Sequence, residues 1–586
     1  MNADEHDVDD SPRGADVTHD DEPVRTGDPH APAPVRSGSR RAVRGGRAPL
    51  VLPTLALVPL AFLAIFFVWP VGAMALRGLA PGGHFDLGGF TDVLTRPRIL
   101  RVLWFTLWMA ALATTCSVLL GVPVAHALYR LRVPGAGVWR ALVVLPFVMP
   151  TVVVGVAFRS LFADGGLLAW LGWDGSWQPV LLAMVFFNVS VVVRTVGPMW
   201  ASLDPRTAES AAALGASPRE VFRTVTWPQL RPAVVSAASV VFLFCSTAFG
   251  IVLMLGGLRY STLETEIYSL TVEFLDLRAA AVLSVTQFVL VAALLVVSER
   301  SRIGRHDERV RRGVAQHAQV RRPTRGDAPA LALTAAVGAL ILAPLLTLLV
   351  RSLRSDGGWT LQHYRGLGDL GVVGALSQSW RIAIDAALLA LVLGVCVSVV
   401  VSWRAVTPAG RRVVRLLDAA FMLPLGVSAV TVGFGFLITL DRPPLDLRSS
   451  SALIPIAQAM VALPLVVRTL TPVLRSLDPR PRDAAAALGA SPVRAWMTAD
   501  LPVLWRPFVA AAGFALAVSL GEFGATAFLA QPDSPTLPVV IYHLIGRPGD
   551  ANFGGAMAAS VVLAAVTGLV MVAVDKIGGA AAGRMG

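Results

Sequence analysis

The chain is poor in charged residues and almost devoid of lysine. Only 15% of its 586 residues are Asp, Glu, Lys or Arg, whereas 55% are hydrophobic. Soluble domains carry about 25% charged residues, so we expect a lipid bilayer to be the solvent of this chain. The single lysine, Lys576, follows Asp575, which excludes a phosphate-binding loop of the Gly-Lys-Ser or Gly-Lys-Thr type. We therefore expect no ATP site and no cofactor in this chain.

Cysteine is also scarce. Cys116, Cys245 and Cys396 stand singly inside apolar runs, without the spacing of a CxxC pair, which argues against a disulfide framework or a zinc site. The nine histidines show no spacing typical of metal ligands. An intramembrane enzyme would need clustered ionisable groups such as HExxH, and the sequence contains none. We expect neither a metal site nor catalytic residues.

Stretches free of Asp, Glu, Lys and Arg recur along the chain. A spanning helix needs roughly 20 apolar residues, and twelve windows suit that length, one of them containing Glu522. The windows are 48–76, 102–129, 141–158, 175–193, 232–257, 279–298, 328–350, 386–403, 419–440, 449–467, 507–532 and 551–574. Their length, and the lack of polar alternation, favour helices over transmembrane strands. We predict an all-α membrane protein with about 12 transmembrane helices.

The polar segments divide the chain into parts. Residues 1–47 are rich in Asp, Glu, Pro and Gly, a composition typical of a disordered tail, here a cytoplasmic one. We predict a first transmembrane half over 48–300, a basic cytoplasmic linker over 301–327, a second transmembrane half over 328–576 and a short cytoplasmic tail over 577–586. The arginines of the linker could bind anionic lipid, but we favour a solvated tether.

Arginine is unevenly distributed between alternate connections. With the N-terminus inside, the cytoplasmic connections hold most arginines, whereas the opposite loops are mixed or acidic, as around Glu264 and Asp276. Both termini should therefore be cytoplasmic, and the net charge of +12 reflects membrane topology rather than nucleic-acid binding. A secretory signal is the alternative over 36–77. Its apolar run exceeds a signal core of about 7–15 residues, so we favour an uncleaved first helix.

The two sides of the central gap contain similar sequences. VRTVGPMWASLDPRTAESAAALGASPREVFRTVTWPQLRP from Val193 matches VRTLTPVLRSLDPRPRDAAAALGASPVRAWMTADLPVLWRP from Val467, without a gap as far as Leu230 and Leu504, at an offset of 274 positions. Further upstream, LPFVMPTVVVGVAF from Leu145 pairs with LPLGVSAVTVGFGF from Leu423 at an offset of 278. Repeats of the same orientation predict two six-helix halves related by an axis along the membrane normal, as in many transporters.

Each copy contains a loop on the side predicted to be cytoplasmic. In the first copy, an alanine-rich helix should end at Gly215 in a left-handed conformation. Ser217 and Glu220 form a possible capping box for a second short helix, and Trp227-Pro228 should stop that helix before the next span. The second copy repeats the pattern, although an arginine replaces the capping glutamate. We predict a helix–turn–helix that projects into the cytosol from each half.

These loops resemble the EAA loop of binding-protein-dependent ATP-binding-cassette importers. The shared pattern is Glu-Ala-Ala, three residues, Gly, nine residues, an apolar residue, one residue and Leu-Pro. The matching positions of the first copy are Glu209, Ala211, Gly215, Val225 and Pro228, with Ser210 and Trp227 as departures. Those of the second copy are Ala484, Ala485, Gly489, Leu501 and Pro502, with Asp483 in place of Glu and Ala499 in place of a bulkier residue. In that family the loop is a coupling helix that seats in a cleft of the ATPase subunit.

The resemblance covers about residues 48–576. With two such loops in one chain, the protein is similar to the fused double permeases of thiamine and ferric-iron importers. The segment FLFCSTAFGIVLMLGGLRYSTLETEIYSL from Phe242 looks like the first half of thiamine permeases, although ferric permeases share parts of it. The resemblance implies a type I importer permease fold in a bacterial inner membrane. It also implies an ATPase dimer at the cytoplasmic face, which hydrolyses the ATP, and an extracytoplasmic solute-binding protein. The unequal departures suggest that the two loops bind unequally.

Two polar residues inside the apolar windows are candidates for the substrate pathway, because polar groups are costly to bury in a membrane. Glu522 lies in the eleventh window, where the repeat aligns it with Ala248. It either lines the pathway and favours a cationic substrate, or it is hydrogen-bonded or protonated within the bundle. Asn188 is the second candidate, with hydrogen bonding between helices as its alternative.

A secondary transporter with parallel six-helix halves is the alternative to an importer permease. It would explain the repeat and Glu522, but it would leave the paired cytoplasmic loops without a purpose. The sequence therefore favours a permease subunit that works with a separate ATPase.

Overall fold

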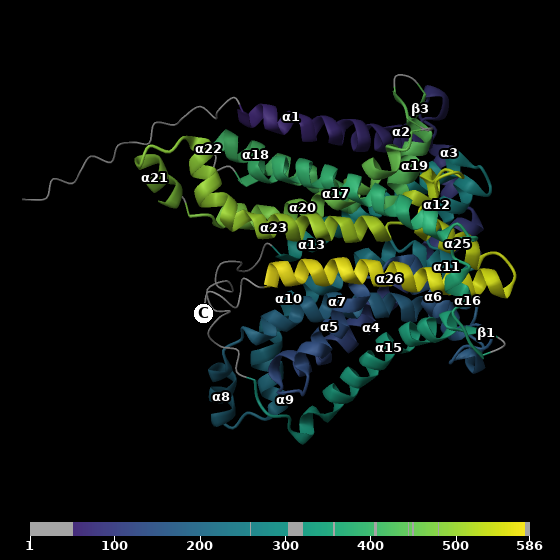
Figure 1. The fold of residues 1–586 in the computed structure, drawn as a ribbon. Helices are drawn as coiled ribbons and strands as arrows, with labels where there is room; N and C mark the ends of the chain where they lie inside the picture. The colour runs from purple at the N-terminus through teal and green to yellow at the C-terminus, as the bar shows by residue number, and fades with distance from the viewer. Residues whose placement is uncertain are drawn as a thin grey trace, which may run out of the picture. The chain divides into compact units, whose positions relative to one another are not determined.

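The computed structural model is almost wholly helical (Figure 1). It describes residues 51–257, 259–302, 320–355, 358–402, 407–442, 445–447, 450–478 and 480–579. The predicted N-terminal tail lies outside the described residues, as do most of the predicted linker and most of the predicted C-terminal tail.

The first half of the described chain runs from α1 to α13. Its elements are α1 (Val51–Leu63), η1 (Ala64–Val68), α2 (Trp69–Leu79), η2 (Pro81–Gly83), α3 (Leu87–Leu94), α4 (Pro97–Arg130), α5 (Ala136–Val148), α6 (Thr151–Phe162), η3 (Ala169–Leu171), α7 (Trp177–Ala201), α8 (Pro205–Ala213), α9 (Pro218–Val221), η4 (Phe222–Thr226), α10 (Trp227–Ser246), α11 (Gly250–Leu255), α12 (Leu263–Val272) and α13 (Leu277–Arg302).

The second half repeats this order and adds two short antiparallel hairpins, β1–β2 and β3–β4. Its elements are η5 (Arg325–Asp327), α15 (Ala328–Ser352), β1 (Arg354–Ser355), β2 (Gly358–Trp359), α16 (Gln362–Arg365), α17 (Val372–Ser402), α18 (Pro408–Met422), η6 (Leu423–Gly426), α19 (Ala429–Thr439), β3 (Asp441–Arg442), β4 (Leu445–Asp446), α20 (Leu453–Ser476), α21 (Arg480–Ala487), α22 (Pro492–Ala495), η7 (Trp496–Asp500), α23 (Leu501–Gly521), α24 (Thr526–Leu529), α25 (Leu537–Ile545) and α26 (Asp550–Gly579).

The number of spans differs from the prediction. Among the described residues, ten helices are long and apolar enough to cross a membrane, and each overlaps a predicted window. The other two windows are broken: α5 and α6 form one pair bent by 105°, and η6 separates α18 from the short apolar helix α19. Pro150 and Pro424 stand in these breaks, where each removes a backbone N–H that a continuous helix needs. The all-α membrane fold is confirmed, and the described part of the chain has ten spans, or eleven if the bent pair of α5 and α6 counts as one, where about twelve were predicted.

The first long helix of each half packs against the opposite half. Helix α1 contacts α17 and α2 contacts α19, whereas α15, which opens the second half, contacts α4 and α6. The exchange runs in both directions, so the two repeated bundles are interlocked rather than merely side by side. Their buried side chains accordingly form a large shared core, in which Phe249 of the first half lies with Phe523 of the second.

A π-helical turn precedes a proline in three of the spans. The turns are η1, η4 and η7, and Pro70, Pro228 and Pro502 follow them. In η4 the Trp227 amide donates to the Phe222 carbonyl five residues earlier, and the widened turn makes room for the proline ring. We predicted that Trp227-Pro228 stops the helix of the first loop. That prediction is wrong, because the chain stays helical from α9 through η4 into α10.

The described end of the predicted linker is bonded to the end of α4. The Arg321 backbone exchanges hydrogen bonds of 2.9 Å with Arg130 and Arg132. The Arg321 guanidinium forms an ion pair of 2.7 Å with buried Asp327, and His126 Nε2 lies 3.2 Å from the same carboxylate. Residues 320–326 are exposed, so the chain leaves solvent only at Asp327, whose buried carboxylate has basic groups of α4 and Arg321 as partners. The solvated tether stays a prediction.

Candidate functional site

Two helix–turn–helix loops occupy the same end of the bundle. Figure 1 shows α8, α9, α21 and α22 at one end and β1, β3, α3 and α16 at the other. The Asp204 side chain accepts the Arg206 amide at 2.9 Å and starts α8. Asp478 does the same for Arg480 at 3.0 Å and starts α21. The repeat in the sequence thus becomes a repeat in space.

The turn inside each loop depends on glycine. Gly215 has a φ of +91° and Gly489 a φ of +85°, values at which a side chain is strained. In the first loop, the Ala216 amide donates to the Ala211 carbonyl at 3.1 Å and closes the end of α8. The second loop makes the matching bond, from Ala490 to Ala485, at 3.0 Å. The predicted left-handed turn at Gly215 is confirmed.

The caps of the second short helices differ between the loops. Glu220 Oε2 accepts the Ser217 amide at 2.8 Å, and Ser217 Oγ accepts the Glu220 amide at 3.4 Å, so the predicted capping box is confirmed. In the second loop Ser491 Oγ accepts the Arg494 amide at 3.4 Å, and position 494 offers no carboxylate in return. The first loop is therefore held more firmly at this point.

The residues of the EAA-like pattern lie on the surface of these loops. The exposed members are Glu209, Gly215, Pro228, Asp483, Ala484, Gly489 and Pro502, and the half-buried members are Ala211, Ala485 and Leu501. Neither α8 nor α21 buries a single residue. Within the described part of the chain, each half therefore has a short helix at the equivalent position whose surface is left uncovered.

Sequence reasoning missed the most prominent residue of each loop. Leu214 and Leu488 are each 90% exposed, and they occupy equivalent positions directly before the two glycines. A single exposed leucine needs no explanation, but two at equivalent positions on projecting turns mark a repeated contact surface. Their place in the repeat was the available signal.

The two loops are anchored by different chemistry. In the second loop, Arg482 forms an ion pair of 2.6 Å with Asp500, whose side chain is 3% exposed. The first loop has Ala208 and Thr226 at the equivalent positions. It is anchored instead by a row of rings, in which His126 contacts Trp200 and Trp200 contacts Phe222, with centroids 4.9 and 6.4 Å apart.

A cavity of about 430 Å³ lies where the two halves meet. Its wall is built largely from the helix breaks of both halves, at equivalent positions: 149–151 with 427–429, and 247–250 with 521–524. Both predicted pathway residues, Asn188 and Glu522, line this cavity. At a helix break, backbone N–H and C=O groups lack helical partners and can contact a solute. A break is also a point at which one helix can reorient relative to the next.

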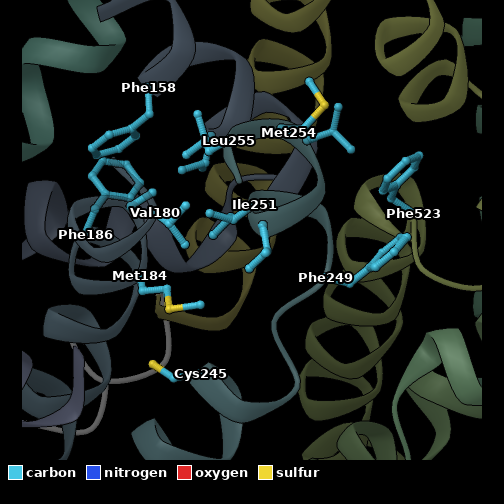
Figure 2. Close-up of a cluster of buried hydrophobic side chains, with 14 of the residues drawn as sticks. Phe158, Val180, Met184, Phe186, Cys245, Phe249, Ile251, Met254, Leu255 and Phe523 are labelled. Atoms are coloured by element: carbon cyan, nitrogen blue, oxygen red, sulfur yellow. The ribbon is translucent and has the colours of Figure 1, made fainter. Parts of the chain in front are cut away.

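A row of four aromatic rings crosses the boundary between the halves beside this cavity. Phe249 and Phe523 are stacked, with centroids 5.5 Å apart and planes at 23° (Figure 2). Tyr268 lies 5.5 Å from Phe249, and Tyr542 lies 5.5 Å from Phe523. Each residue of the second half stands 274 positions after its counterpart, as in the sequence repeat. The axis relating the halves therefore passes between the two stacked rings.

Glu522 lies at the end of a helix and not inside one. Helix α23 ends at Gly521, and the Glu522 carboxylate caps α24: Oε1 accepts the Ala525 amide at 2.8 Å, and Oε2 accepts the Thr526 hydroxyl at 2.5 Å. The prediction that Glu522 sits within a continuous span is wrong, because the break supplies free amides that stabilise the carboxylate. Its side chain is hydrogen-bonded, and it also lines the cavity.

Asn188 is bonded within the bundle. Its Nδ2 donates to the Met184 carbonyl at 2.9 Å and lies 3.3 Å from Cys245 Sγ on α10. Asn188 therefore links α7 to α10, in addition to lining the cavity.

The structure adds a buried carboxylate that sequence reasoning placed in an outer acidic loop. Glu264 is 0% exposed on α12, and its Oε2 accepts the Ser428 hydroxyl at 2.6 Å. Ser428 belongs to the other half and lines the cavity. No apolar run marks α12 as buried, because this helix is short and folds back into the bundle against α19.

A helical bundle of two interlocked and repeated halves, with a cavity between them and paired loops at one end, defines a multi-pass membrane permease. A family model described as "Binding-protein-dependent transport system inner membrane component" matches residues 117–311. A thiamine transport system permease protein of Brucella abortus (strain 2308) is 30% identical over 545 residues, 90% of this chain and 96% of that protein. The chain belongs to this family of inner-membrane permeases of ATP-binding-cassette importers.

Other relatives cover either the whole chain or one half of it. A thiamine transport system permease protein of Escherichia coli (strain K12) is 27% identical over 466 residues, 76% of this chain and 83% of that protein. A sulfate transport system permease protein of Salmonella typhimurium is 31% identical over 273 residues, 44% of this chain but 95% of that protein. A solved bacterial ABC transporter involved in alginate import aligns over 44% of this chain and 96% of that chain, at 17% identity and a TM-score of 0.36.

Proposed function

We propose that this chain is the permease of an ATP-driven importer that carries thiamine or a thiamine-like solute across a bacterial inner membrane. Relatives spanning 76% and 90% of the chain are named as thiamine transport permeases, which supports this solute over ferric iron. The observation that supports coupling to ATP hydrolysis is the pair of loops at one end of the bundle, each with a glycine in its turn. A secondary transporter has no use for two such loops.

Each loop docks one subunit of an ATPase dimer on the cytoplasmic side. The exposed faces of α8 and α21 contact the ATPase, and Leu214 and Leu488 insert into apolar surface on it. Both termini of the permease are then cytoplasmic, as the arginine distribution predicts. ATP is bound and hydrolysed on the partner, and this chain holds no cofactor. Because the loops continue directly into α10 and α23, their movement reaches the helix breaks without an intervening flexible segment.

The solute enters from the opposite end of the bundle. An extracytoplasmic binding protein delivers it there; the description of the matched family as binding-protein-dependent supports such a partner. Membrane lipid surrounds the spans between the two ends. The cavity of about 430 Å³ falls within the usual range of small-molecule sites, and both halves contribute to its wall. Closure of the ATPase dimer favours one arrangement of the halves over the other and thereby exposes the cavity to one side at a time.

The test is transport by a reconstituted complex. The permease is purified with its ATPase and binding protein, placed in proteoliposomes, and assayed for uptake of radiolabelled thiamine. We expect uptake that requires ATP, the ATPase and the binding protein. Uptake driven by an ion gradient without ATP would favour the secondary transporter, and uptake of other solutes but not thiamine would overturn the proposed substrate.

A further inference from the structure

Glu264 is a buried carboxylate that forms no ion pair with any residue in the described ranges. Its neighbour on the same helix, Glu266, is equally buried and forms an ion pair of 2.6 Å with Arg98. Glu264 receives a single hydrogen bond, from Ser428, and its Oε1 has no hydrogen-bond partner among the described residues. A carboxylate in such a place is costly. This cost is not offset at Glu264, although Glu266, two residues further along the chain, is paired with Arg98.

The Glu264 carboxylate adjoins the cavity through one side chain. Ser428 lines the cavity, and its hydroxyl donates a hydrogen bond to Glu264, so the Ser428 oxygen can act toward the cavity only as an acceptor. Ser428 also caps α19 by accepting the Thr431 amide at 3.1 Å. A hydroxyl that donates to a carboxylate becomes a stronger acceptor, so the cavity wall at this point is electron-rich.

Glu522 reaches the same part of the wall from the other direction. A methyl group added at Gly524 would lie 2.9 Å from Ala429 Cβ and 3.3 Å from Glu522 Oε1. The two carboxylates therefore flank the N-terminal end of α19, Glu264 from the first half and Glu522 from the second. They are not related by the repeat, because their counterparts are Pro538 and Ala248. Each half thus supplies one carboxylate from its own position.

We propose that Glu264, acting through Ser428, and Glu522 form a pair of carboxylates that makes this cavity selective for a positively charged organic solute. The inference rests on the proposed function and names a positioning residue for its substrate. Phe249 and Phe523 also line this cavity, so aromatic rings stand in the same wall as these polar groups. A cation that enters the cavity favours the ionised form of these buried carboxylates, and the attraction is strong there because little water screens it.

The test measures charge at position 264 separately from shape. Initial rates of ATP-dependent thiamine uptake are compared for Glu264→Gln, which keeps the size and loses the charge, and Glu264→Asp, which keeps the charge and is shorter. We expect Glu264→Gln to lower the rate on the order of tenfold, and Glu264→Asp to retain most of it. Ser428→Ala, which cuts the link to the cavity, should resemble Glu264→Gln. The exposed Glu273→Gln, on the C-cap of the same helix, is the matched control and should transport as the wild type does.

The possible results separate the role of the Glu264 charge from the proposed substrate. Binding-protein-stimulated ATP hydrolysis shows that a variant is folded and assembled. If Glu264→Gln transports thiamine as fast as the wild type, or if Glu264→Asp loses as much as Glu264→Gln, the charge has no role and the inference is overturned while the proposed function stands. If the wild-type complex itself carries no thiamine, the proposed substrate fails, and the assignment of these carboxylates fails with it.

Discussion

Replacing the loop glycines with alanine tests whether the shape of the turn carries the coupling. At Gly215 and Gly489 the backbone has φ values of +91° and +85°, and an added methyl group would meet nothing within 4 Å in the described part of the chain. The substitution therefore adds no clash, and its cost is the strained backbone alone. For a residue other than glycine this cost is about 1–2 kcal/mol per site.

The strain acts on the loop and not on the core. Neither α8 nor α21 buries a residue, so each loop can lose its turn without unfolding the bundle. A cost of about 1–2 kcal/mol lowers the population of the docking shape by a factor of about 5–30. We expect the affinity of the ATPase for the permease in nanodiscs to fall by that factor for each of Gly215→Ala and Gly489→Ala, with the thermal midpoint of the permease nearly unchanged.

Gly135→Ala is the matched control. Gly135 precedes α5, has a φ of +66°, and also meets nothing within 4 Å among the described residues, but it lies outside the two loops. We expect the same backbone strain there without a loss of ATPase affinity. The reasoning is refuted if both loop variants bind the ATPase as tightly as the wild type, or if Gly135→Ala weakens binding to the same extent.

Two further predictions concern packing and ion pairing. Gly433→Ala places a methyl group 2.9 Å from the Ala525 Cα, so we expect a loss of about 1–3 kcal/mol and a lower thermal midpoint. Gly568→Ala, with nothing within 4 Å among the described residues, should leave that midpoint unchanged, and equal midpoints for the two variants would contradict the packing. Arg482→Ala removes the partner of buried Asp500 and should destabilise the second loop alone, by about 1–3 kcal/mol. Titration with ATPase would then show one weakened and one intact site, and two intact sites would contradict the assignment.

The spans and the repeat could be predicted because both depend on residues that are close together in the sequence. An apolar run of roughly 20 residues has few alternatives to a membrane helix. A gap-free repeat of about forty residues forces the same turns in both halves, as at Gly215 and Gly489. The capping box of Ser217 and Glu220 was predictable for the same reason, since its partners lie three residues apart.

The breaks in the helices could not be predicted from composition. The sequence is apolar on both sides of Glu522, so the composition of this window does not predict that α23 ends at Gly521. The end is set by tertiary packing, because a Cβ at Gly521 would lie 3.2 Å from Pro150 of the other half. The same limit applies to Glu264, whose burial depends on how α12 folds back against α19. The exchange of α1 and α15 between halves is likewise a property of the assembled bundle.

The exposed leucines show a different kind of limit. Leu214 and Leu488 are apolar, and a pattern of apolar residues indicates burial until a structure shows the opposite. The combination of 90% exposure with equivalent positions in the repeat is what makes them candidates for the contact with the ATPase. The sequence family pattern around them does not include this position, so no motif would have selected it.

The two equivalent loops are expected to face the cytoplasm and to dock an ATPase there. Single cysteines at Leu214→Cys and Leu488→Cys, in a background without the three native cysteines, can be labelled with a membrane-impermeant maleimide in vesicles of defined orientation. We expect both positions to react only from the cytoplasmic side and to be protected when the ATPase is added. Labelling of either position from the external side, or full reactivity with the ATPase bound, would contradict the account.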